Sequence, residues 1–173
     1  MKTSAVVAFY RQIGTDDRGR SLDDVRSQDF LALEAVHDYI QWLFPLPEPS
    51  MANHNAPVLN ENDIEAFRSD RGLQNELTES LLRMLAFYGL RLDGPFESPR
   101  VSPGGDFSDR ASVWLTPYNH NFLRISRILR SLTVLGLEKH AQALLACLEE
   151  IYQEYADVIG ATSVRYWRNA VVK

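Results

Sequence analysis

The sequence predicts an all-α fold, a single compact helical domain of about six or seven helices with two long loops. Apolar residues recur every three or four positions in each long segment, which is the period of an α-helix. β-Branched and aromatic residues concentrate only in segment 4–10, which is either a short strand or a first helical turn. The length of 173 residues fits one domain, so we expect residues 1–173 to fold as a unit.

The N-terminal part is predicted to contain a short capped helix and one strongly apolar helix. Ser21 is a suitable N-cap, and Asp23 and Asp24 favour the positive end of the helix dipole that follows. Segment 29–44 carries apolar residues on nearly every face, which is typical of a central helix. Pro45 cannot continue that helix, so we expect it to end there.

Further helices are predicted after residue 60, separated by proline-rich or glycine-rich segments. Asn60 can cap the first of them, and Gly89 and Gly160 stand where two of them should end. Segments 45–59 and 91–117 contain all eight prolines and show no periodicity, so we expect them to be the two long loops. The expected helices cover residues 61–67, 70–88, 118–135, 138–158 and 162–171.

Composition excludes several classes of protein. A net charge of −5 argues against a chain that grips nucleic acid over most of its surface. The sequence contains no run of about 18 apolar residues, so we expect no transmembrane segment and a cytoplasmic location. The single cysteine, Cys147, cannot form an intramolecular disulfide, and its apolar surroundings predict a small buried side chain.

The motifs of common catalytic and metal sites are missing from the sequence. The four histidines include no pair at helical spacing, and a second cysteine that could share a zinc ion is lacking. No serine lies in a Gly-x-Ser-x-Gly turn, and the pair Gly104–Gly105 is not followed by the lysine of a phosphate loop. We therefore expect a protein that is not an enzyme, with no catalytic residues, no metal and no cofactor.

Two rows of polar residues on predicted helices are the candidate binding residues. The first row contains Glu34, His37 and Gln41, which would share one face of a helix over 29–44, beside Trp42. Its alternative interpretation is the solvated face of a half-buried helix.

The second row contains His120, Arg124, Arg127 and Ser131, spaced 4, 3 and 4 residues apart. Two guanidinium groups and an imidazole near a helix start, with free backbone N–H groups, predict an anion site. The alternative is structural, with the arginines paired to buried carboxylates; the candidates are Glu34, Glu149 and Glu150.

Several sequence blocks resemble the conserved domain of the opioid growth factor receptor family. Residues 39–45 read Tyr-Ile-Gln-Trp-Leu-Phe-Pro, within a longer block over 37–50 that is followed by a second block over 55–59. Blocks over 84–92 and 120–138 resemble the same family in the same order. The resemblance covers about residues 9–150. It implies a helical domain and, from the family's name, a non-enzymatic receptor for an enkephalin-type peptide.

We therefore predict a binding domain for a peptide or a small anionic ligand, with another protein as a further possible partner and no nucleic acid. In this interpretation the second row forms the anion site and the first row faces it. The predicted ligand-binding residues are His37, Gln41, Trp42, His120, Asn121, Arg124 and Arg127. Two alternatives remain open, a structural or protein-interaction domain and an enzyme that uses His37 or His120 as acid and base.

Overall fold

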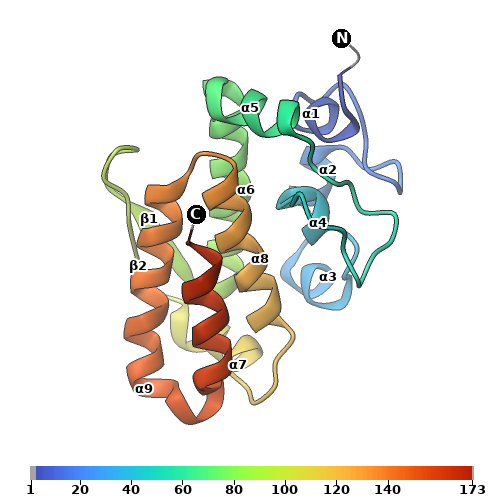
Figure 1. Ribbon diagram of the computed structural model, residues 1–173. Coiled ribbons are helices and arrows are strands. Elements are labelled where there is room, and N and C mark those ends of the chain that lie inside the picture. Colours follow the sequence, from blue (N-terminus) through green and yellow to red (C-terminus); the bar gives the residue numbers. More distant parts are fainter. Residues whose placement is uncertain (1–2, 173) are drawn as a thin grey trace. The chain divides into compact units, whose positions relative to one another are not determined.

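The computed structural model describes residues 3–172 and is mostly helical (Figure 1). Within these residues the chain forms nine helices and one two-stranded antiparallel sheet. The helical class is confirmed, whereas a strictly all-α fold and a count of six or seven helices are wrong. The helices are α1 (Ala5–Tyr10), α2 (Leu22–Arg26), α3 (Phe30–Ala35), α4 (Ile40–Leu43), α5 (Glu61–Ser69), α6 (Arg71–Tyr88), α7 (Phe107–Trp114), α8 (Asn121–Val134) and α9 (Glu138–Ala170), and the strands are β1 (Leu90–Asp93) and β2 (Arg100–Pro103).

The chain divides into two compact units, residues 1–80 and 81–173, with the division inside α6. The expectation that residues 1–173 form one domain stays a prediction. No helix among the described residues combines the length and the apolar character that crossing a membrane requires.

The helix starts of the first unit follow the side chains that cap them. Ser21 and Asp24 form a capping box at α2, and Asn60 and Asp63 form another at α5. In both boxes the side chains satisfy backbone N–H groups that a helix start leaves without partners. Segment 4–10 is helical, because Ser4 caps α1 through the backbone N–H of Val7. The caps predicted at Ser21 and Asn60 are confirmed.

The predicted helix over 29–44 is wrong, because the chain leaves the helical conformation between α3 and α4. Val36 is extended, with φ −100° and ψ 135°. In a continuous helix the Leu33 carbonyl would accept the N–H of the residue four positions later, but it accepts the Tyr39 hydroxyl at 2.9 Å instead. Arg20, from the loop before α2, binds Asp38 at 2.8 Å and so holds the segment that connects α3 and α4. These tertiary contacts outweigh a helix propensity that valine, histidine and aspartate make weak.

Aromatic side chains form the centre of the first unit. Phe9 packs edge-on against Trp42 with ring centres 5.3 Å apart, and Tyr10 packs against Phe67 at 4.9 Å. The Tyr10 hydroxyl donates to the Leu43 carbonyl, and burial raises its pKa above the ordinary range. The short helices α1, α4 and α5 are therefore joined by one aromatic cluster.

The predicted loop over 91–117 contains a β-hairpin and the helix α7, and it is therefore wrong as a loop. Gly89 ends α6 with a φ of 74°, and Gly94 turns the chain with a φ of 87°. Strand β1 then pairs with β2 so that Leu92 lies opposite Val101. The strand signal was the alternation of leucine with polar residues in β1, which is too short to stand out from the turn residues around it.

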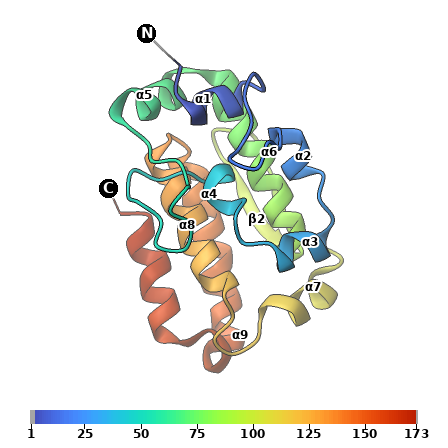
Figure 2. The same ribbon diagram turned by 90° about the vertical axis from the view of Figure 1, so that its right-hand side faces the viewer.

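The second unit is built around α8 and α9, which lie side by side in both views (Figures 1 and 2). α9 is interrupted at Tyr155 and Gly160, whose backbone angles are not helical. After this break the chain returns as the red helix of Figure 1, antiparallel to the first part of α9. Trp167 on the returning part donates its indole N–H to the Phe122 carbonyl at 3.0 Å. The prediction of two successive helices separated near Gly160 is confirmed.

Candidate functional site

The predicted residues of the first polar row no longer share one helix face. Glu34 belongs to α3, Gln41 to α4, and His37 lies in the extended segment between them. Gln41 is buried and His37 is exposed, so the two side chains have different environments. The predicted spacing of this row was wrong because it assumed a continuous helix.

Trp42 is buried, with 5% of its surface exposed. Its indole N–H donates to Asp17 Oδ1 at 2.9 Å, which fixes the ring against a loop of the first unit. This satisfies the polar atom that burial of a tryptophan would otherwise leave without a partner.

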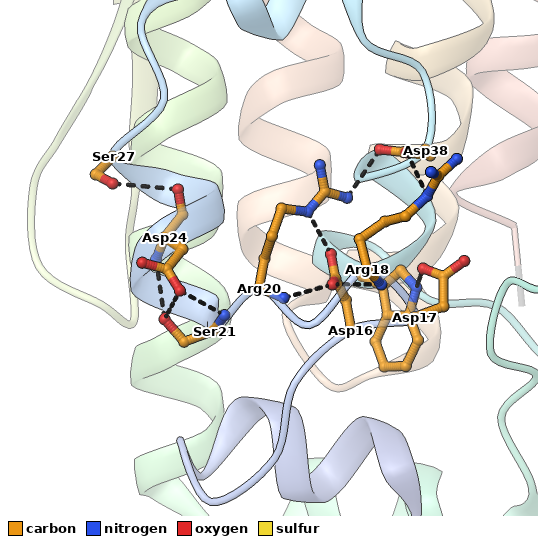
Figure 3. A network of polar contacts seen from close by, with 9 residues as sticks. Asp16, Asp17, Arg18, Arg20, Ser21, Asp24, Ser27 and Asp38 are labelled. Carbon is orange, nitrogen blue, oxygen red and sulfur yellow. Dashed lines mark hydrogen bonds and ion pairs between the residues drawn. The ribbon is translucent and has the colours of Figure 1, made fainter.

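The loop that holds Trp42 is organised by Asp16, which the analysis of the sequence did not identify. Asp16 Oδ1 accepts the backbone N–H groups of Arg18 and Arg20 at 2.9 and 2.8 Å. Its Oδ2 accepts the Arg20 Nε at 2.7 Å, and Arg20 also binds Asp38 (Figure 3). The signal in the sequence is the aspartate itself, because an aspartate side chain commonly accepts the backbone N–H two residues further on and so closes a turn.

Arg20 is the centre of this ion-pair network. Burial acts against its charged form, but hydrogen bonds to Asp38 and Asp16 outweigh that effect and raise its pKa. Arg20 therefore stays charged, and it ties the loop to the segment between α3 and α4.

Gln41 carries a buried acceptor. Its Oε1 has no hydrogen-bond partner among residues 3–172. A buried polar atom left without a partner typically costs about 1–3 kcal/mol, so such atoms are uncommon in folded proteins.

In the second unit, the predicted residues surround the first turn of α8. Asn121 is fully buried and Arg124 is 5% exposed, whereas His120 is exposed. Asn121 Oδ1 accepts the Arg124 Nη1 at 3.3 Å, and the Asn121 amide lies 3.4 Å from the His120 Nε2. The structure therefore joins His120, Asn121 and Arg124 into one polar cluster, which we call the α8 cluster.

The backbone N–H groups at the start of α8 are not free, and this part of the predicted anion site is wrong. Asn119 Oδ1 accepts the N–H of Asn121 at 2.9 Å, and the Asn119 carbonyl accepts that of Phe122 at 3.1 Å. The next N–H group, from Leu123, bonds the His120 carbonyl at 3.2 Å. Asn119 was the sequence signal, because asparagine readily closes such turns. Any anion bound here would depend on side chains rather than on the helix end.

The remaining members of the second row differ in exposure. Arg127 is half-buried, and Ser131 is fully buried. Glu149, one of the carboxylates considered as an internal partner, binds Arg168 at 2.6 Å. The pairing of His37, Gln41 and Trp42 with the α8 cluster stays a prediction.

The described residues contain no group of three or more histidine, cysteine, aspartate or glutamate side chains that could hold a metal ion. Cys147 is buried, as expected, and burial raises its thiol pKa to about 12. Its thiol is therefore protonated at neutral pH and a poor nucleophile.

Comparison with known proteins identifies the family of the chain. The model of the opioid growth factor receptor conserved region matches residues 5–173. The chain belongs to this family. The match confirms the resemblance seen in the sequence blocks, and it includes both the buried Trp42 and the α8 cluster.

Members of the family in animals are longer than this chain. The opioid growth factor receptor of Mus musculus is 38% identical over 143 residues, which are 80% of this chain and 22% of the mouse protein. The Homo sapiens receptor is also 38% identical, with 80% of this chain and 20% of the human protein covered. Opioid growth factor receptor-like protein 1 of Mus musculus is 36% identical over 117 residues, which are 68% of this chain and 24% of that protein. No solved structure matches the chain.

Proposed function

We propose that this chain is a non-enzymatic binding domain whose α8 cluster, together with Arg127 further along the same helix, accepts a negatively charged group of a peptide. The family's receptors are named for the opioid growth factor, so an enkephalin-type peptide is the first ligand to test. The chain spans about a quarter or less of those relatives, and its share of their activity is part of the proposal.

The observation that carries the proposal is the fixed position of Arg124. Its guanidinium is almost completely buried at the first turn of α8, where the Asn121 side chain accepts one of its N–H groups. A guanidinium presents five donors in a planar fork that matches a carboxylate. Because its position is fixed before a ligand arrives, little side-chain freedom would be lost on binding.

The test is a binding titration that compares arginine variants. We expect Arg124→Gln and Arg127→Gln to weaken binding of an enkephalin-type peptide about tenfold or more, as loss of a charged hydrogen bond typically does. A peptide with an amidated C-terminus lacks the carboxylate, so its affinity for the original chain should be lower by a similar factor. Arg165→Gln, at an exposed position of α9, removes the same charge and should bind as the original chain does.

Circular dichroism must first show that each variant keeps its helices. Folded Arg124→Gln and Arg127→Gln variants that bind the peptide unchanged would refute the proposal. If Arg124→Gln unfolds, the half-buried Arg127 and the amidated peptide still decide the question.

A second candidate function is a structural or protein-interaction domain in which the polar rows are internal. The burial of Gln41, Asn121 and Arg124 favours it, since a binding site usually leaves such groups open to solvent. Unfolding of both arginine variants, together with no measurable peptide binding by the original chain, would support this function.

An enzyme based on His37 or His120 has less support. Both side chains are exposed, and the His120 Nε2 lies 3.4 Å from the amide of Asn121, a group that does not titrate. General acid–base catalysis usually places the histidine in a cleft beside a second titratable group.

A further inference from the structure

A cavity of about 450 Å³ lies in the second unit, where the start of α8 meets the break in α9. One side is formed by Pro117, Tyr118 and Phe122, and the other by residues 157–163. Cavities of roughly 300–1,000 Å³ are typical of sites for small ligands. None of these residues was singled out as a binding residue from the sequence.

Two unusual backbone conformations flank this cavity. Tyr118 has a φ of 59°, a left-handed conformation that is uncommon for any residue other than glycine. Gly160, opposite, has φ 77° and ψ 149°, which is essentially restricted to glycine. A Cβ at Gly160 would meet no atom within 4 Å, so the glycine serves the backbone conformation rather than close packing. Such backbone conformations concentrate at ligand sites, where the surrounding structure enforces them.

The residues around the cavity combine an apolar wall with one charge. Phe122 and Ile159 are buried and apolar, and Asp157 is the charged side chain among the described residues that line the space. Tyr118 is fully exposed, so both faces of its ring are open to a ligand. An aromatic face together with a carboxylate is the usual environment of a bound ammonium group.

The helix that restarts after Gly160 does not change the preference of the cavity for a cation. A helix N-terminus carries a partial charge of roughly +0.5, whereas the Asp157 carboxylate carries a full negative charge. The whole chain has a net charge of −5, which further favours a cation over an anion.

We propose that this cavity binds a protonated primary amine attached to an apolar ring or chain. Asp157 binds the ammonium group, the Tyr118 ring covers it, and the apolar part lies against Phe122 and Ile159. This cation site uses other residues than the α8 cluster, so it stands or falls independently of the peptide function proposed above.

The test is a titration of the whole chain with phenethylammonium and, separately, with its neutral counterpart 2-phenylethanol. Binding is measured from the NMR shifts of the backbone amides. We expect saturable shifts for the amides of residues 118–122 and 157–163 with the amine, and at least tenfold weaker binding of the alcohol, on the order of one lost charged hydrogen bond. Equal binding of the two probes, or saturable shifts confined to other parts of the chain, would overturn the proposal. Absence of saturable shifts at millimolar probe would also overturn it.

Matched variants separate the charge and the ring. Asp157→Asn should weaken amine binding about tenfold, whereas Glu150→Gln, an equal charge change at another exposed position of α9, should leave it unchanged. Tyr118→Phe keeps the ring and should bind normally. Tyr118→Asn removes the ring but tolerates the left-handed backbone, so its folded form should bind several-fold more weakly. Equal amine affinity of Asp157→Asn and Glu150→Gln would refute the assignment of Asp157.

Discussion

Several buried side chains of this protein carry a polar atom that is hydrogen-bonded inside the fold. Trp42, Asn121 and Arg124 each place a polar atom inside the fold, and each of those atoms has a defined partner. The Trp42 indole and Asp17 are the clearest case, because one hydrogen bond lets a large aromatic ring be buried. Burial of the aromatic surface stabilises the fold, and the hydrogen bond removes the free-energy cost of burying the indole N–H without a partner.

Replacement of Trp42 should show this division directly. Trp42→Ala is expected to lower the free energy of unfolding by about 3–5 kcal/mol, because it removes a buried ring that packs on Phe9. Trp42→Phe keeps most of the ring but loses the bond to Asp17, and should cost less than the alanine variant. Urea titration measures both values. A loss under about 1 kcal/mol for Trp42→Ala would show that the ring is not central to the fold.

At the scale of elements, short segments are positioned by contacts that lie outside them. α4 has only four residues and depends on the Tyr39 hydroxyl and on Asp38 for the position of its start. The hairpin depends on Gly89 in a similar way, since α6 must end in a left-handed conformation before β1 begins.

Gly89 is therefore expected to tolerate no side chain. A Cβ at this position would lie 2.7 Å from the Phe107 Cα and 2.9 Å from the Arg110 Cβ, and the φ of 74° adds backbone strain. We expect Gly89→Ala to cost about 2–4 kcal/mol in unfolding free energy.

Gly105→Ala is the matched control, because a Cβ at Gly105 would meet no atom within 4 Å. Its cost should stay within about 0.5–1 kcal/mol in the same urea titration. Similar costs for the two alanine variants would contradict the close approach of α7 to Gly89.

At the scale of the whole molecule, carboxylates at helix starts make stability depend on pH. The side chain of Arg11 and the backbone N–H of Gly72 lower the pKa of Asp70, which precedes α6. The backbone N–H and the hydroxyl of Ser21 lower that of Asp24 in α2. A carboxyl group whose pKa is lower in the folded state stabilises the fold when ionised. That stabilisation is complete above the ordinary value of 3.8 and is lost as the pH falls through the lower folded value.

We accordingly expect the free energy of unfolding to fall as the pH drops from about 5 to about 2. Asp70→Asn can still cap α6 but cannot ionise, so its stability should fall less steeply over this range. Urea titrations at several pH values measure the two slopes. Identical slopes for the original chain and for Asp70→Asn would show that Asp70 contributes nothing to the acid sensitivity.

The helical class, the family and most of the longer helices could be predicted from the amino-acid sequence alone. Periodicity and capping residues act within a few positions along the chain, so Ser21, Asn60 and Gly160 were recognisable without a structure. The apolar character of segment 29–44, in which Trp42 is buried, was likewise visible in the sequence. The polar row of α8 was correctly placed on one helix, although the role of its arginines as a ligand site stays a prediction.

The places where the chain departs from these local preferences could be seen only in the folded structure. Val36 is extended because Tyr39 and Asp38 find partners elsewhere, and the N–H groups at the start of α8 are occupied because Asn119 turns back onto them. The cavity beside Tyr118 and Asp157 joins segments about 40 residues apart. Contacts between distant residues are fixed by packing and hydrogen bonding in three dimensions, for which a single sequence carries no periodic signal.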